Sequence, residues 1–215
     1  MSEAEQRLQQ LTNAVLAGDS EETRQKTYAA LAKATPTEAL DAVIEAANIL
    51  LDLNELGGTD RNRLLGAEAA INACLRVLET ILSSSEGKFD FTVAVGPVGF
   101  EWGHLLSTSI AALLRSVGFH AVNLTKTKTA LELLRNSEEL GAEIVLPLLA
   151  KDELDVQLQS LKDEIERGGF ASKLRIIPVA RGLAENVSSP FYTAKNVDEA
   201  VSKALEWAIR NSEAE

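Results

Sequence analysis

The chain has 215 residues, 46% of them hydrophobic and 25% charged, and its formal net charge at pH 7 is −11. This length and composition suit one α/β domain, or a small domain with a helical partner, and the negative charge argues against a general affinity for nucleic acid. No apolar run reaches the roughly 20 residues of a membrane span, and the stretch MSEAEQRLQQ lacks the basic and apolar regions of a secretory signal, so we expect a cytoplasmic protein.

Residues 1–85 are predicted to form a bundle of four helices. The first has an apolar stripe that ends at Gly18, and Asp19 is the expected N-cap of the second. Thr35, Pro36 and Glu38 form a capping box with proline at the first helical position of the third helix. The fourth is expected over residues 60–82, with a stripe of Leu64, Ala67, Ile71, Leu75, Leu78 and Ile81.

This fourth helix contains Cys74, the only cysteine in the sequence. A single cysteine excludes an internal disulfide and a thiolate-rich metal site. Since Cys74 lies in the apolar stretch AAINACLRVL, we interpret it as a buried, inert thiol.

After a predicted linker at residues 83–88, the pattern changes to short β-rich runs that alternate with helical ones. This alternation indicates βαβ units, and nearly continuous apolar strands are typical of a parallel sheet that is covered on both faces. We therefore predict an α/β fold, with a helical domain at 1–85 and a flavodoxin-like, doubly wound domain of five parallel strands at 86–215. The strands are expected within residues 89–95, 119–125, 142–149, 174–180 and 191–194.

The stretch GPVGFEWGHLL, residues 96–106, follows the first strand and is the best candidate for a functional loop, because open α/β sheets bind ligands at the carboxyl ends of their strands. Its glycines do not match a dinucleotide fingerprint or a phosphate-binding P-loop, and it has no nucleophile elbow. What remains is His104 with a carboxylate, Glu101, three residues earlier. A carboxylate can orient an imidazole that binds a metal, and the glycines permit close approach of a large planar ligand.

On these residues the sequence resembles the cobalamin-binding corrinoid proteins of methyltransferase systems, almost over its whole length. The stretch ALLRSVGFHAVNL at residues 112–124 is similar to the family's helix and second strand. LAGDSEE and LLGAEAAINACLRVLETIL resemble parts of its four-helix cap domain, and FYTAKNVDEAVSKAL resembles its closing strand and helix. The resemblance implies a helical cap followed by a flavodoxin-like domain, with cobalamin bound as cofactor.

The family's loop reads D-x-H-x-x-G, and its histidine is the lower ligand of cobalt. A gap-free alignment places that histidine at Gly103, the aspartate at Glu101 and the last glycine at Leu106, so His104 lies one position late. The resemblance still implies His104 as the metal ligand. The positions that match the family's nucleotide-tail pocket are Pro147 or its neighbours Leu148 and Leu149, together with Ala180 and Arg181. The full expected cofactor site is Gly99, Glu101, Trp102, Gly103, His104, Pro147, Leu149, Ala180 and Arg181.

Each of these side chains also has an ordinary structural interpretation. His104 is either a cobalt ligand or a residue that hydrogen-bonds at the start of a helix, and Glu101 either orients it or is a solvated charge. Trp102 either lies against a macrocycle or packs the loop onto the sheet. Arg181 either meets a phosphate of the cofactor tail or forms a surface salt bridge. The second histidine, His120, opens a strand and is taken as structural.

The resemblance implies a carrier subunit that accepts a methyl group on a bound corrinoid and passes it between partner methyltransferases, without catalysing turnover alone. A second hypothesis is a sensory or regulatory descendant of this fold, which binds cobalamin weakly, binds haem through His104, or binds no cofactor. A third, a flavodoxin-like enzyme with a small-molecule substrate, has no group of residues in the sequence to support it.

Overall fold

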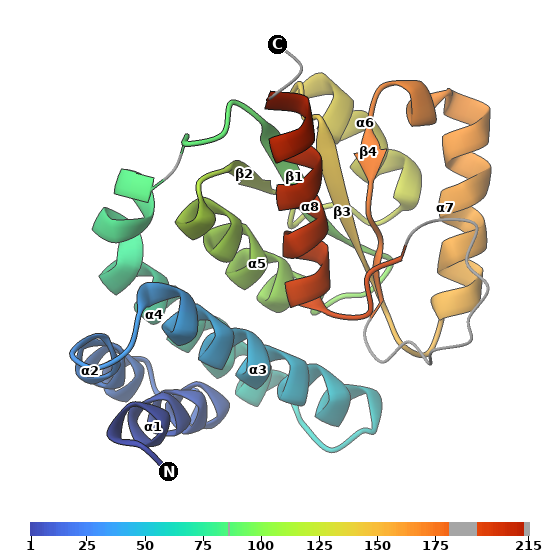
Figure 1. The fold of residues 1–215 in the computed structure, drawn as a ribbon. Coiled ribbons are helices and arrows are strands. Elements are labelled where there is room, and N and C mark those ends of the chain that lie inside the picture. Colours follow the sequence, from blue (N-terminus) through green and yellow to red (C-terminus); the bar gives the residue numbers. More distant parts are fainter. Residues whose placement is uncertain (86, 181–192, 213–215) are drawn as a thin grey trace. The chain divides into compact units, whose positions relative to one another are not determined.

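The structure is a computed structural model that describes residues 1–85, 87–180 and 193–212 (Figure 1). The chain divides into two compact units, which are Met1–Glu86 with Thr108–Val117, and Gly87–Ser107 with Gly118–Glu215. The two predicted domains, 1–85 and 86–215, stay a prediction, because compactness alone does not show that each part folds separately.

Four helices form the first 85 residues of the helical unit, as the sequence predicts. Asp19 accepts the backbone N–H of Glu22, and Thr35 and Glu38 form the predicted capping box. The fourth helix is longer than expected and continues through the first half of the predicted linker. The bounds are α1 Glu3–Ala17, α2 Ser20–Leu31, α3 Pro36–Glu55 and α4 Arg61–Ser85.

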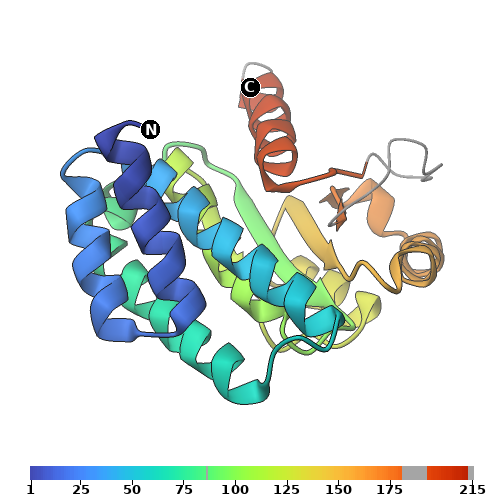
Figure 2. The same cartoon turned by 90° about the horizontal axis from the view of Figure 1, so that it is seen from below.

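In this unit α1 packs against α2 and α3, and α2 packs along α4 (Figures 1 and 2). The α1–α2 turn approaches α4 so closely that two glycines meet. Gly18 has a φ of +73°, which is the left-handed conformation that ends α1. A Cβ atom added at Gly66 would lie 3.3 Å from the Cα of Gly18. The large side chains that are fully buried in this unit include Leu11, Leu40, Leu50, Leu64, Ile71 and Leu78.

The described residues of the second unit form a five-stranded, entirely parallel sheet in the order β2-β1-β3-β4, with β5 also paired to β3. The predicted fold class is therefore confirmed. The strands are β1 Thr92–Val98, β2 His120–Asn123, β3 Ile144–Leu149, β4 Arg175–Ile176 and β5 Val179–Ala180.

The strands differ from the prediction at the far edge of the sheet. The predicted fourth strand, 174–180, is divided into β4 and β5 because Pro178 has no N–H for the ladder. In the predicted fifth strand, residues 191 and 192 lie outside the described part of the chain, and Ala194 forms a single parallel bridge with Val179.

Helices follow the strands, as expected for alternating β and α elements. Figures 1 and 2 show α8 on the opposite side of the sheet from α6, and Trp207 of α8 makes an edge contact with Phe91 at a ring distance of 5.1 Å. Asn196 caps α8 by accepting the N–H of Glu199. The helices are α5 Gly103–Val117, α6 Ala130–Glu139, α7 Leu154–Gly168 and α8 Val197–Ser212, with a 3-10 turn, η1, at Phe170–Ser172.

The apolar core of the sheet unit includes a cluster between the sheet and helices α6 and α7. It consists of Val98, Ala130, Leu133, Leu134, Val145, Leu149, Leu158, Leu161, Ile165, Phe170 and Leu174. Within the described ranges, no helix is both long enough and apolar enough to cross a membrane.

The contact between Gly18 and Gly66 gives a test of the helical unit. We expect Gly66→Leu to lower the free energy of unfolding by about 1–3 kcal/mol, because the new side chain meets the backbone of Gly18 and cannot rotate away from it. Urea denaturation measures the change. Ala69→Leu, at an exposed position of the same helix, is the matched control and should change stability by less than about 0.5 kcal/mol. Equal stabilities of the two variants would contradict the close contact.

Candidate functional site

The parallel register brings the carboxyl ends of β1, β3 and β5 to one edge of the sheet. Val98, the last residue of β1, pairs with Leu149 of β3, and Leu149 pairs with Ala180 of β5. On the other side of β1, Val95 pairs with Asn123, the last residue of β2. The candidate loop after β1 therefore lies at the carboxyl ends of the strands, where α/β sheets place their ligand sites.

Two glycines shape the turn from β1 into α5. Gly99 has a φ of +78°, in the left-handed region that L side chains rarely adopt. A Cβ atom at Gly103 would lie 2.5 Å from both Phe100 Cζ and Pro97 Cβ. The gap-free alignment with the corrinoid-protein motif places a histidine at position 103, but in this chain the space for such a side chain is filled. The role of His104 as the ligand in place of that histidine stays a prediction.

His104 is the second residue of α5 and is half-buried. Its Nδ1 donates to the carbonyl oxygen of Glu101 at 3.1 Å, so the main chain fixes the ring. In a neutral imidazole this leaves the lone pair on Nε2, which is the arrangement that metal-binding histidines commonly use. The ring of Trp102 lies beside it, with centroids 5.6 Å apart and planes at 37°. The predicted orienting role of the Glu101 carboxylate stays a prediction.

A cleft of about 550 Å³ opens beside this turn, between the β1–α5 loop and the β2–α6 loop. Thr127 is buried at its base, and its hydroxyl lies 3.0 Å from the carbonyl oxygens of Pro97 and Leu124. This contact ties the second loop to the end of β1. The cleft is lined by Pro97, Gly99, Phe100, Glu101, Thr125, Lys126, Thr127 and Lys128.

The sequence analysis missed the contribution of the β2–α6 loop. Lys126 and Lys128 are both exposed and bring two ammonium groups to the cleft, opposite the single carboxylate of Glu101. The alternating stretch TKTKT at residues 125–129 was the available signal. This stretch follows β2 as the candidate loop follows β1, so both loops begin at the same edge of the sheet.

Gln157 of α7 is a second residue that the sequence analysis did not select. It is 5% exposed, and its Oε1 accepts the N–H of Ala150 at 2.7 Å. Its Nε2 would lie 3.3 Å from a Cβ atom at Gly99. Gln157 therefore bonds to the β3–α7 turn and lies close to Gly99 of the β1–α5 turn. A glutamine next to Leu158 in an otherwise apolar stripe was the signal for it.

The residues predicted for a nucleotide-tail pocket lie in the interior. Pro147, Leu149 and Ala180 are buried in β3 and β5, and Leu149 belongs to the apolar cluster with α6 and α7. None of the three lines the cleft. Arg181 lies outside the described residues.

The thiol of Cys74 does not form a reactive site. Its residue is fully buried in α4, and burial raises the pKa of the thiol to about 11, although a hydrogen bond with Thr27 opposes the shift. A thiol with this pKa is almost entirely protonated at neutral pH. His120 opens β2, is exposed, and its backbone N–H bonds to the carbonyl of Phe91.

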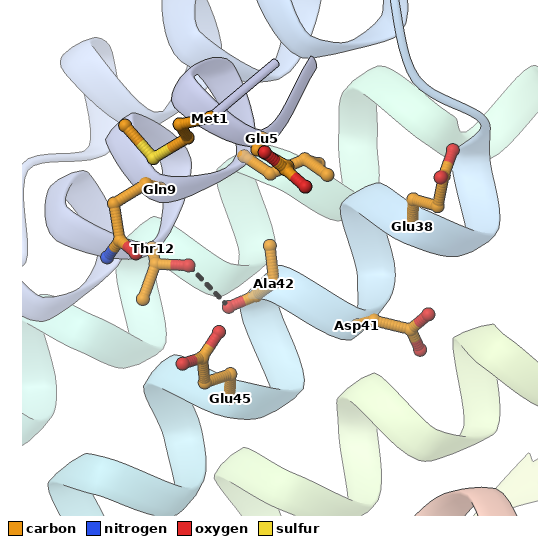
Figure 3. Close-up of a pocket in the computed structure, with 9 residues that line it drawn as sticks. Met1, Glu5, Gln9, Thr12, Glu38, Asp41, Ala42 and Glu45 are labelled. Atoms are coloured by element: carbon orange, nitrogen blue, oxygen red, sulfur yellow. Dashed lines mark hydrogen bonds between the residues drawn. The ribbon is translucent and has the colours of Figure 1, made fainter. Parts of the chain in front are cut away.

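A second groove, of about 430 Å³, runs between α1 and α3 and is lined by four carboxylates (Figure 3). Two of them act in helix capping boxes: Glu5 binds the N–H of Ser2, and Glu38 binds that of Thr35, which holds the pKa of Glu38 below its usual value. Thr12 closes the groove by donating to the carbonyl of Ala42 at 3.2 Å. No group of three or more metal-ligating His, Cys, Asp or Glu side chains occurs among the described residues, so this groove is not assigned as a metal centre.

No protein-family model matches the sequence, and no curated protein matches it. Among solved structures, the monomethylamine corrinoid protein of Methanosarcina barkeri matches with a TM-score of 0.64 at 17% identity, over 94% of this chain and 98% of that chain. A cobalamin-binding protein from Desulfitobacterium hafniense DCB-2 has a TM-score of 0.47, with 14% identity over 96% and 99% of the two chains. The methanol:cobalamin methyltransferase complex of M. barkeri has a TM-score of 0.49, with 15% identity over 96% and 83%. The first match shows that this chain has the corrinoid-protein fold, a helical region followed by an α/β region.

The crowding at Gly103 is testable by substitution. We expect Gly103→Ala to lower the free energy of unfolding by about 1–3 kcal/mol, because the added methyl group must displace Phe100 and Pro97. Two of the three closest atoms belong to Phe100. The double variant with Phe100→Ala should therefore lose less than the sum of the two single variants in urea denaturation. Additive losses would show that the two residues do not meet.

The raised pKa of Cys74 predicts slow labelling by an aromatic disulfide reagent. With a pKa of about 11 in the folded protein, roughly 0.1% of the thiol is ionised at pH 8, so we expect labelling only after unfolding in urea. The folded state prefers the neutral thiol, because burial raises its pKa. The contribution of this preference to the free energy of unfolding is therefore complete below pH 9 and is lost as the pH rises toward 11. Rapid labelling of the native protein at pH 8 would contradict the burial, and Cys74→Ser is the blank.

Proposed function

We propose that this protein binds a corrinoid cofactor and carries methyl groups between partner methyltransferases. The observation that carries the proposal is the fold, which matches that of the monomethylamine corrinoid protein over nearly the whole of both chains. Such a match covers the helical region as well as the sheet, so it supports more than the common flavodoxin-like architecture. Since a fold hosts many functions, the residues at the sheet edge must also fit.

The imidazole of His104 would be the protein group that holds the cobalt of a bound corrinoid. It lies at the turn after β1, and the hydrogen bond from Nδ1 to the Glu101 carbonyl holds the ring in the way that such bonds orient metal-binding histidines. The neighbouring Trp102 provides an aromatic face, and Gly99 keeps the loop backbone open. When bound, a corrinoid supplies a cobalt centre that is nucleophilic in its low-valent state and can carry a methyl group.

The residues aligned with the tail pocket do not fit a buried nucleotide in the same way. Leu149 packs into the core with α6 and α7, and Ala180 is fully buried. The proposal therefore assigns the loop from Gly99 to His104 to cofactor binding, and gives Pro147, Leu149 and Ala180 only a packing role. In this proposal the protein binds and orients the cofactor and presents it to partner enzymes, and it does not catalyse turnover alone.

One observation favours the second candidate, a sensory protein that binds haem through His104. Lys126 and Lys128 line the cleft beside the loop. Ammonium groups pair well with carboxylate side chains such as the propionates of haem, whereas the side chains of a corrinoid ring are amidated and uncharged. The two candidates therefore differ in what these lysines contribute.

Cofactor retention tests the proposal. The purified full-length chain is mixed with hydroxocobalamin, and the excess is removed by gel filtration before the visible spectrum is recorded. We expect the wild type and His120→Ala to retain the corrin, and His104→Ala to lose the histidine-dependent band and bind at least about tenfold more weakly, since disturbing a metal site's ligands costs 10–100-fold in affinity. His120→Ala is the control because that histidine opens β2 and is exposed.

Three other outcomes have distinct meanings. Retention with an unchanged spectrum in His104→Ala would show that the imidazole is not the ligand. Failure of the wild type to retain any corrin would sink the carrier proposal. In that case, uptake of haem by the wild type, with weaker uptake by Lys126→Gln and Lys128→Gln, would support the sensory candidate.

A further inference from the structure

We infer that the helical unit contains a binding site for a phosphate group, formed by Arg76 of α4 and Arg115 in the last turn of α5. The two guanidinium groups line one pocket of about 430 Å³ within this unit. The lining residues are Asn72, Leu75, Arg76, Glu79, Leu82, Ser83 and Arg115. No part of the proposed corrinoid site contributes to it, so the inference is independent of the proposed function.

Arg115 supplies the first observation. Its side chain is half-buried, and its Nε is shielded from solvent with no hydrogen-bond partner within the described ranges. A guanidinium carries five N–H donors and no acceptor, and buried donors in native proteins are nearly always paired. The Nε is out of reach of solvent, but the side chain of Arg115 lines the pocket, so an acceptor that enters the pocket can bind the terminal N–H groups of this guanidinium.

The charge of the pocket gives the second observation. Arg76 and Arg115 contribute two positive charges and Glu79 one negative charge, so the lining has a net charge of +1, in a chain whose net charge is −11. The remaining polar side chains, Asn72 and Ser83, can both donate hydrogen bonds. A cationic, donor-rich pocket in an acidic protein indicates an anionic ligand.

The geometry of the donors favours phosphate. A guanidinium binds phosphate through two parallel N–H bonds from a planar fork. Here the two arginines come from different helices, α4 and α5. A tetrahedral oxyanion can accept from several directions at once, which a planar carboxylate does less well. The volume leaves room for a small group attached to the phosphate as well as for free phosphate.

Calorimetric titration of the full-length, cofactor-free chain tests the site, with inorganic phosphate and with glycerol 3-phosphate as probes at constant ionic strength set by chloride. We expect saturable binding of at least one probe to the wild type, and a Kd at least tenfold higher in Arg115→Gln and in Arg76→Gln. Arg115→Lys keeps the positive charge but loses the planar pair of N–H donors, so its Kd should lie between those of the wild type and Arg115→Gln. Arg61→Gln is the matched control, because it removes the same charge from the exposed start of the same helix, and its Kd should stay within twofold of the wild type.

The two probes distinguish the source of the phosphate, since tighter binding of glycerol 3-phosphate would identify an ester and equal binding would identify the free ion. Circular dichroism checks that each variant is folded, and Arg76→Gln changes an exposed side chain, so it tests the site even where Arg115→Gln fails to fold. The inference is overturned if the wild type binds neither probe saturably, or if Arg76→Gln and Arg61→Gln bind equally well.

Discussion

The parallel pairing of β1 with both β2 and β3 is the constraint on which the candidate site depends. It brings three loops to one edge of the sheet, because parallel strands all end on the same side. The pairing also demands a glycine at position 96, where a Cβ atom would lie 2.8 Å from Leu133 Cδ1 and 2.9 Å from the carbonyl oxygen of Leu124. The strand can therefore approach the β2–α6 loop, and the cleft forms between the two loops.

The turn into α5 shows how packing decides which residue can carry chemistry. Position 103 faces Phe100 and Pro97, which must shift to admit a Cβ atom, while the side chain at position 104 is held by a hydrogen bond from its Nδ1 to the carbonyl oxygen of Glu101. A histidine one place later than in the corrinoid-protein motif is consistent with this packing. The sequence gives only the spacing of Glu101 and His104. Whether position 103 has room for a side chain depends on the packing of Phe100 and Pro97.

Local charge differs sharply from net charge in this protein. The chain carries −11 overall, yet Lys126 and Lys128 line the cleft of the sheet unit, and Arg76 and Arg115 line the pocket of the helical unit. The acidic residues that outnumber them include helix-capping carboxylates such as Glu5 and Glu38. Net charge thus excludes broad classes of partner, but it does not describe the ligand preference of an individual pocket.

The sequence by itself determined the order and type of most elements, because their signals are local. Thr35 with Glu38, and Asn196 with Glu199, mark helix starts within three residues, and apolar runs mark β1 and β3. Tertiary structure decided the placement of Gln157 beside Gly99. It also joined Arg76 to Arg115, which are 39 positions apart in the sequence (115 − 76). These features depend on contacts between residues far apart along the chain, and periodicity within a single segment carries no information about such contacts.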